Sequence, residues 1–239
     1  MLVMLSGAIG AGKDTFGEFL YDSFDKFGYN VEVVKFADPI REAAFKLGFN
    51  PDDRATKEVP AIRHYKLSEL DEAIFTTHTC LTPYERRMVA VRVHQRLINI
   101  RKEKHDGIYK PVVSTREFMQ VVGGTVRDAD VDYYIKHMLS NVPVGRINIC
   151  TDSRFLNEQK IGDYSIYVER PNNPLAVNTL DASEAAQASL RGAAKKVILN
   201  NSTLDNLAEM ADYVATTLIS KGYCDDAVKE SSGTGILIE

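Results

Sequence analysis

Residues 7–15 of this 239-residue chain read GAIGAGKDT, in which Gly7, Gly12 and Lys13 fit the pattern GxxxxGK. The apolar run LVMLS precedes this stretch at residues 2–6, and residues 14–27 follow it with apolar side chains at helical spacing. A glycine turn between a buried strand and a helix lets successive backbone N–H groups face phosphate oxygens, and the helix N-terminus adds partial positive charge. The stretch therefore predicts a phosphate-binding loop, or P-loop, in preference to an ordinary glycine turn.

The loop also predicts where a nucleoside triphosphate and its metal ion bind. The expected ATP-binding residues of the loop are Gly10, Ala11, Gly12, Lys13, Asp14 and Thr15. Lys13 is expected to contact the β- and γ-phosphates and to act in catalysis. A Ser or Thr that holds Mg²⁺ usually follows this lysine, whereas here Asp14 does. Either the Asp14 carboxylate or the Thr15 hydroxyl could be the metal ligand. The alternative for Asp14 is a negative charge that stabilises the first turn of the helix.

The rest of the chain alternates strands with helices, and this order predicts an α/β fold. Strands are expected at residues 2–6, 31–36, 146–151, 164–169 and 196–200, and helices at 14–27, 39–47, 83–104, 114–122, 130–140, 154–161 and 204–218. The pattern predicts a three-layer P-loop sandwich with a mainly parallel central sheet. Asp38 is expected to cap the helix that follows it. Residues 1–224 are predicted as one domain with a helical insert at 48–112, irregular over 48–81, a lid-like segment at 170–195 and a flexible tail at 225–239.

Composition and charge exclude several classes of protein. The net charge is −4 and the sequence pI is about 5.8, which argues against a broad basic face for nucleic acid. The three cysteines are widely spaced and the five histidines show no metal-ligand spacing, so neither disulfides nor a zinc site are expected. No apolar run approaches the roughly 20 residues that span a bilayer. These features predict a cytoplasmic protein that binds neither nucleic acid nor membrane.

A second acidic group follows the run RINICT at residues 146–151. Asp152 stands directly after this predicted strand, where the Walker B acid of a P-loop protein organises Mg²⁺. The alternative is that Asp152 caps the helix predicted at 154–161, and both roles are compatible. Arg154 suits the ligand crevice at the carboxyl end of a parallel strand, and the alternative for it is a surface ion pair with Glu158.

Residues 114–127, STREFMQVVGGTVR, carry a third group of chemical side chains. Arg116, Gln120 and the pair Gly123-Gly124 share one helical face and its end, and Arg127 lies just beyond. A cation, an amide and bare backbone suit a nucleoside monophosphate, whereas the alternative is a solvated face that a glycine cap ends. The lid-like segment carries the basic residues Arg170, Arg191, Lys195 and Lys196. Two interpretations are open: these side chains cover ATP when the segment closes, or they are solvated charges.

The chain resembles the deoxynucleoside monophosphate kinases of tailed bacteriophages. The matching pieces are GAIGAGKDT, FADPIREA, TREFMQVVGGT, TDSRFLNEQ, VERP and VILNNSTLDNLAE, scattered over residues 3–210. The resemblance implies an enzyme that transfers the γ-phosphoryl group of ATP, with Mg²⁺, to deoxynucleoside 5′-monophosphates (dNMPs) for viral DNA synthesis. A homodimer is left open. The alternatives are a dephospho-coenzyme A or phosphomevalonate kinase and, outside this class, an NTP-dependent switch.

The resemblance also assigns roles to individual residues. It implies that the catalytic residues are Lys13, Arg116, Asp152, Arg154 and Glu158, and that the metal ligands are Asp14, Thr15 and Asp152. It implies that the residues binding the acceptor are Ala37, Asp38, Arg116, Gln120, Gly123, Gly124, Thr125, Arg127 and Tyr134. Arg191 is expected to contact ATP from the lid-like segment.

Overall fold

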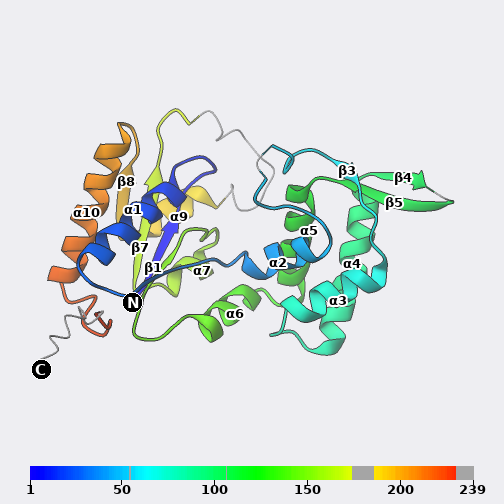
Figure 1. Ribbon diagram of the computed structural model, residues 1–239, viewed down its shortest axis with the longest axis horizontal. Helices are drawn as coiled ribbons and strands as arrows, with labels where there is room; N and C mark the ends of the chain where they lie inside the picture. Colours follow the sequence, from blue (N-terminus) through cyan, green and yellow to red (C-terminus); the bar gives the residue numbers. More distant parts are fainter. Residues whose placement is uncertain (54, 106, 174–185, 230–239) are drawn as a thin grey trace, which may run out of the picture. The chain divides into compact units, whose positions relative to one another are not determined.

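The computed structural model describes residues 1–53, 55–105, 107–173 and 186–229, which form two compact units (Figure 1). The sheet unit combines Met1–Lys35 with Asn141–Glu239, and the helical unit is the continuous segment Phe36–Ser140. The helical unit contains the insert predicted at 48–112 and extends beyond it at both ends.

The sheet unit is built on a five-stranded sheet in the order β2-β6-β1-β7-β8. The strands are β1 (Leu2–Ser6), β2 (Val31–Val34), β6 (Ile147–Cys150), β7 (Tyr164–Glu169) and β8 (Lys196–Leu199). Every pairing in this sheet is parallel, so the predicted α/β fold with a parallel central sheet is confirmed. Strand β1 is buried along its whole length, as its apolar sequence predicts.

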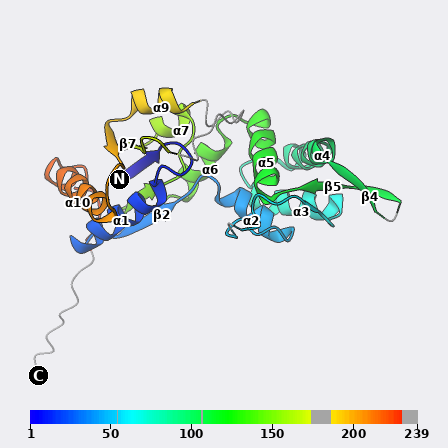
Figure 2. The same ribbon diagram turned by 90° about the horizontal axis from the view of Figure 1, so that it is seen from above.

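Helices cover both faces of this sheet. Figure 2 shows α1 (Lys13–Lys26) and α10 (Leu204–Ser220) on one face and α7 (Leu156–Lys160) and α9 (Gln187–Ala193) on the other. The core under α1 and α10 is apolar and includes Phe16, Leu20 and Phe24 of α1, which are fully buried. Burial of such side chains contributes about 1.5–3 kcal/mol each to stability.

The strand register brings four polar segments to one edge of the sheet. In the parallel ladder Met4 lies opposite Cys150, Ser6 opposite Tyr167, and Glu169 opposite Leu199. Because the strands are parallel, the residues that follow β1, β6, β7 and β8 all emerge at their carboxyl ends. The glycine loop and Asp152 therefore meet at an edge that the sequence pattern alone predicts to be a ligand crevice.

The helical unit packs its helices against one another, with a small antiparallel sheet beside α4. Its helices are α2 (Asp38–Lys46), α3 (Leu67–Thr77), α4 (Pro83–Ile100), α5 (Thr115–Ala129) and α6 (Tyr133–Asn141). Its strands, in the order β3-β5-β4, are β3 (Ala61–Ile62), β4 (Lys102–His105) and β5 (Ile108–Val113). Phe49, after α2, stacks on Phe118 of α5 with the ring centroids 4.2 Å apart, which joins α2 to the first turn of α5.

Two element predictions in this unit are wrong. Residues 48–81 were expected to be irregular, but they hold β3 and α3, whose buried Leu70, Ala73 and Ile74 recur at helical spacing. The helix expected at 83–104 ends at Ile100, because Arg101 is extended (φ −154°, ψ 145°) and the next residues pair with β5.

The glycine pair of α5 is inside the helix and does not end it, so the predicted end at residue 122 is also wrong. Neither glycine has a positive φ, and the helix continues to Ala129. A Cβ on Gly123 would lie 3.2 Å from Cδ1 of Ile40, whereas one on Gly124 would meet nothing within 4 Å. Gly123 therefore serves the close packing of α2 against α5, which accounts for a glycine in mid-helix.

The remaining differences concern helix caps and the segments predicted as lid and tail. Asp38 is the first residue of α2 and not its cap; the cap position is Ala37, which makes no side-chain hydrogen bond. Within the lid-like segment, residues 186–195 contain the short helix α9, while 174–185 and, in the predicted tail, 230–239 lie outside the described residues. Among the described helices, none is long and apolar enough to cross a membrane.

Candidate functional site

The glycine loop between β1 and α1 has a backbone that only glycine adopts readily. Gly7, Gly10 and Gly12 have φ values of 147°, 72° and 93°. A Cβ on Gly7 would collide with the carbonyl oxygen of Val168, and a Cβ on Gly12 would collide with Nδ2 of Asn200. The loop is therefore pressed against the ends of β7 and β8, and its shape depends on the absence of side chains.

Lys13 is the first residue of α1, and its ammonium group lies over the loop. Nζ donates to the carbonyl oxygens of Gly7 and Ala8, both at 2.8 Å. Gly12 occupies the N-cap position with left-handed backbone and no side chain to satisfy the first N–H groups of the helix. A cation and the amino end of a 14-residue helix thus converge on the same loop, as anion binding requires.

Two carboxylates, those of Asp14 and Asp152, accept hydrogen bonds from consecutive residues at the end of β6. The Thr151 hydroxyl donates to Oδ1 of Asp14 at 2.9 Å, and the Cys150 thiol donates to Oδ1 of Asp152 at 3.3 Å. Burial raises the pKa of the Cys150 thiol, and the carboxylate of Asp152 adds to this effect, so the thiol stays a donor. A Cβ on Gly17 would lie 2.6 Å from Cγ2 of Thr151, which explains how α1 comes so close to this strand end.

These residues fit a magnesium ion that shares its coordination with phosphate and water. Mg²⁺ is usually held by one or two carboxylates, with substrate phosphates and water as the other ligands. Asp14, Thr15 and Asp152 supply two carboxylates and a hydroxyl. Among residues 1–53, 55–105, 107–173 and 186–229, no group of three or more His, Cys, Asp and Glu side chains could hold a metal ion. A metal ion here would therefore need phosphate or water among its ligands.

The alternative that Asp152 caps α7 is wrong, because another residue has that role. Phe155 is the N-cap residue, and Oε2 of Glu158 accepts the backbone N–H groups of Arg154 and Phe155 at 2.8 and 3.2 Å. Glu158 is only 2% exposed. Its carboxylate therefore shapes the turn that follows Asp152, and this turn leaves the Arg154 side chain exposed at the strand end.

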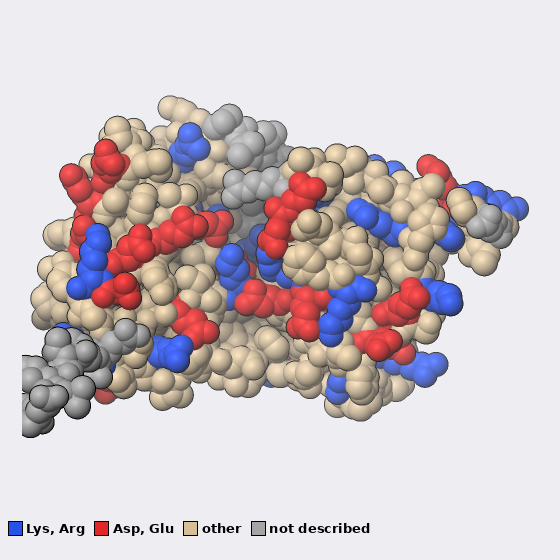
Figure 3. Space-filling view, in the orientation of Figure 1, with Lys and Arg blue, Asp and Glu red and all other residues tan. Residues whose placement is uncertain are grey.

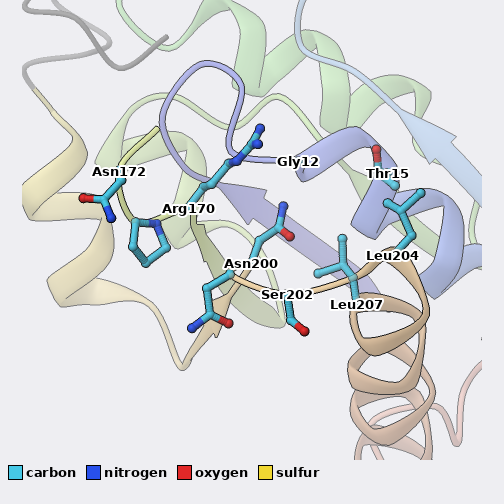
Figure 4. Close-up of a pocket in the computed structure, with 10 residues that line it drawn as sticks. Gly12, Thr15, Arg170, Asn172, Asn200, Ser202, Leu204 and Leu207 are labelled. Atoms are coloured by element: carbon cyan, nitrogen blue, oxygen red, sulfur yellow. The ribbon is translucent and has the colours of Figure 1, made fainter. Parts of the chain in front are cut away.

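A pocket of about 520 Å³ opens next to the loop within the sheet unit (Figure 4). Arg170 and Asn200 point toward the loop, where Arg170 Nη1 lies 3.5 Å from the Gly10 carbonyl oxygen and Asn200 Nδ2 donates to Ala11 at 2.9 Å. The lining residues are Gly12, Thr15, Arg170, Pro171, Asn172, Asn200, Asn201, Ser202, Leu204 and Leu207. The pocket therefore combines an apolar wall from α10 with amide groups and one guanidinium.

Sequence reasoning missed the asparagines of this pocket. Asn200 follows β8, and the only signal was a run of polar residues at a predicted strand end. Arg191, which was expected to contact ATP, donates from Nε and Nη2 to Oε2 of Glu169 at 3.1 and 3.0 Å and does not line the pocket; its contact with ATP stays a prediction. Arg170, the other arginine of the lid-like segment, does line it.

The predicted acceptor residues all lie in the helical unit, and α5 carries most of them. Arg116 forms an ion pair with Glu58, and its backbone N–H donates to the Lys57 carbonyl at 3.1 Å. Gln120 is exposed one turn further along the helix. Arg127 is centred over the ring of Tyr134 at 4.6 Å, so the structure brings these two predicted residues together.

Other residues predicted to bind the acceptor are engaged inside this unit. The Thr125 hydroxyl is fully buried, donates to the Val121 carbonyl at 2.7 Å and accepts from Arg96 at 2.8 Å. The Ala37 carbonyl accepts the Arg41 N–H at 2.9 Å in the first turn of α2, and Asp38 beside it is exposed. On the face drawn in Figure 3, acidic and basic side chains are interspersed, as expected for a chain of net charge −4.

Comparison with known proteins gives structural likenesses only. No family model and no curated protein matches the chain. Among solved structures, TT1252 from Thermus thermophilus is 15% identical, with 91% of this chain and 97% of that chain covered and a TM-score of 0.41. Dephospho-CoA kinase from Campylobacter jejuni is 15% identical, with 93% and 98% covered and a TM-score of 0.36. At these values the likenesses define no function, and the chemistry of the site rests on its own residues.

Proposed function

We propose that the chain is a P-loop kinase that transfers the γ-phosphoryl group of ATP to a deoxynucleoside 5′-monophosphate. The observation that carries the proposal is the glycine loop with the Lys13 ammonium over it, next to Asp14, Asp152 and a nucleoside-sized pocket at one edge of the sheet unit. The acceptor class rests on the resemblance of GKDT, DSRFLNE and TREFMQVVGGT to the phage kinases.

The donor half of the proposed site follows from the sheet unit alone. The loop N–H groups and Lys13 bind the phosphates, and the pocket between Arg170, Asn200 and Leu204 holds the nucleoside. Asp14, Thr15 and Asp152 hold Mg²⁺, which neutralises charge on the phosphates when bound. On nucleotide binding, the Lys13 ammonium exchanges the Gly7 and Ala8 carbonyls for phosphate oxygens.

The protein's part in the reaction is to position two anions and to neutralise their charge. Phosphoryl transfer requires no covalent intermediate on the protein, and a phosphate acceptor needs no strong general base. Lys13 and the exposed Arg154 are the cations of the sheet unit that we assign to the transferred group. Arg116 and Gln120 of α5 bind the acceptor, and Arg127, held over the Tyr134 ring, belongs to the same proposed set.

The experiment is a coupled assay of ADP formation with each of the four dNMPs, dephospho-coenzyme A, phosphomevalonate and no acceptor. We expect acceptor-dependent ADP formation with at least one dNMP and little ATP loss without acceptor. Activity with dephospho-coenzyme A or phosphomevalonate alone would move the chain to another small-molecule kinase class. ATP loss that no acceptor stimulates would favour an NTP-dependent switch.

The assignment of the two substrates is tested by varying each in turn. Arg116→Ala is expected to raise the KM for the dNMP at least tenfold more than the KM for ATP, because it removes a charge-assisted contact to the acceptor only. Arg92→Ala is the matched control, since Arg92 is exposed on α4 and has no assigned role. Equal effects of Arg116→Ala on both KM values would mean that the acceptor site is elsewhere.

A further inference from the structure

The first turn of α5 is covered by a short segment that we call the acidic turn, residues 50–53 and 55–58. The Lys57 carbonyl accepts the backbone N–H of Arg116 at 3.1 Å, and the Glu58 carboxylate forms an ion pair with the guanidinium of the same arginine. At the other end of the turn, Asp52 forms an ion pair with Arg41 of α2. One segment therefore engages two arginines and a helix N-terminal N–H.

The acidic turn holds its own shape. Oδ1 of Asn50 accepts the N–H groups of Asp52 and Asp53 at 3.1 and 3.3 Å, and Oδ1 of Asp53 accepts the N–H of Ala55 at 2.9 Å. The Lys57 N–H donates to the Asp53 carbonyl at 2.9 Å. None of these local bonds involves Arg41 or Arg116.

The groups that the turn places on Arg116 imitate a phosphate. A backbone N–H in the first turn of a helix together with a guanidinium is a combination that binds phosphate oxygens. Here a carbonyl oxygen takes the N–H and a carboxylate takes the guanidinium. Both ion pairs have the arginine inside and the acid outside: the side chains are 33% and 24% exposed for Arg116 and Arg41, but 56% and 63% for Glu58 and Asp52.

We propose that the acidic turn is an internal mimic of the acceptor phosphate, which a dianionic phosphate must displace from Arg116, so that Glu58 sets how tightly the site binds its acceptor. The proposal rests on the proposed function, because it takes Arg116 as the acceptor arginine. A phosphate monoester carries nearly two charges and three strong acceptor oxygens, whereas a carboxylate carries one charge and two oxygens. We therefore expect a dianion to displace Glu58 from the Arg116 guanidinium, whereas a monoanion of similar size binds this guanidinium little better than Glu58 does.

The experiment measures binding of inorganic phosphate and of each dNMP to the full chain by isothermal titration calorimetry, in the wild type and in Glu58→Gln. A self-masked site binds more weakly by the fraction of molecules that are unmasked. Because exposed ion pairs contribute little, we expect Glu58→Gln to lower the dissociation constants by about two- to fivefold. Glu103→Gln is the matched control, since Glu103 is an exposed carboxylate on β4 of the same unit.

A double-mutant cycle locates the competition. In an Arg116→Ala background, Glu58→Gln should have no further effect on phosphate binding, because the contested guanidinium is gone. Glu58→Gln should also tighten the binding of a dNMP and of its singly charged 5′-phosphate methyl ester by the same factor, because both ligands compete with the same mask. Thermal unfolding of each variant establishes that it is folded.

Unchanged or weaker phosphate binding in Glu58→Gln would overturn the proposal, as would an equal gain with and without Arg116. These results are separable from the proposed function, because calorimetry with phosphate needs no catalysis. If no dNMP is phosphorylated but Glu58→Gln still tightens phosphate binding through Arg116, the kinase assignment fails and the masked anion site stands. If dNMPs are phosphorylated and Glu58→Gln changes nothing, the kinase assignment stands and the masked anion site fails.

Discussion

Replacing Gly12 by alanine is expected to damage the phosphate loop in a way that depends on Asn200. The backbone at Gly12 has φ 93°, and holding a residue with a Cβ there is expected to cost about 1–3 kcal/mol. The new Cβ would also collide with Asn200 Nδ2 and break its hydrogen bond to the Ala11 carbonyl, which contributes about 1 kcal/mol. We therefore expect Gly12→Ala to lower the free energy of unfolding by about 2–4 kcal/mol.

The dependence on Asn200 is measured by a double-mutant cycle. Asn200→Ala alone should lower the free energy of unfolding by about 1 kcal/mol, because only the hydrogen bond is lost. In the double variant this bond is lost once, so the combined effect should fall short of the sum by about 1 kcal/mol. Both single variants should weaken ATP binding, Gly12→Ala by at least about tenfold, since the loop N–H groups are displaced from their positions.

Urea unfolding and calorimetric titration with ATP measure these two quantities. Gly192→Ala is the control: Gly192 lies in α9, has no positive φ, and a Cβ there would meet nothing within 4 Å. It should be neutral or stabilise by about 0.5–1 kcal/mol, as Gly-to-Ala does inside a helix. Strictly additive effects of Gly12→Ala and Asn200→Ala, or a Gly12→Ala loss below about 0.5 kcal/mol, would refute the loop geometry described here.

Three further outcomes are expected. Lys13→Ala should lower kcat on the order of 10²–10³-fold, because it removes a transition-state cation; steady-state kinetics with near-normal kcat would contradict this. Asp152→Asn should lose activity that excess Mg²⁺ partly restores in a metal titration, and an effect independent of Mg²⁺ would exclude a role at the metal. Burial, with His137 nearby, lowers the pKa of His78 to about 3. Below about pH 6.5 His78 binds a proton in the unfolded chain but not in the folded protein. The free energy of unfolding that His78 contributes is therefore fully present above that pH, and it falls by about 2 kcal/mol between pH 7 and pH 5. Urea unfolding should show this loss reduced in His78→Gln, and an identical loss in that variant would mean that other groups cause it.

The parts of the structure that sequence predicted best are those that local patterns determine. The glycine loop, the buried strand before it and the helix after it are encoded within residues 2–27, and each element lies within a residue or two of its expected place. Asp152 was singled out because it directly follows an apolar strand, where the Walker B acid of a P-loop protein stands. The parallel sheet followed from the alternation of strands and helices.

The parts that sequence did not predict depend on contacts between distant segments. Gly123 looks like a helix end until Ile40, from another helix, is known to fill the space beside it. Glu58 and Asn200 carry no motif of their own, and their places in the site come from partners 58 and 189 residues away. Arg191 was expected to contact ATP from the lid-like segment, and its pairing with Glu169 is a tertiary contact that a single sequence does not reveal.

The division of the sheet unit by the helical unit imposes an order on synthesis. Strand β1 pairs with β6 on one side and with β7 on the other, and both lie beyond residue 140. At about 5–20 residues per second, the ribosome completes β1 on the order of 7–30 seconds before its first partner strand exists. During that time the apolar stretch LVMLS has no strand to cover it, whereas the continuous helical unit is complete. A nascent chain halted near residue 140 should therefore hold a protease-resistant helical unit and a first strand that chaperones bind.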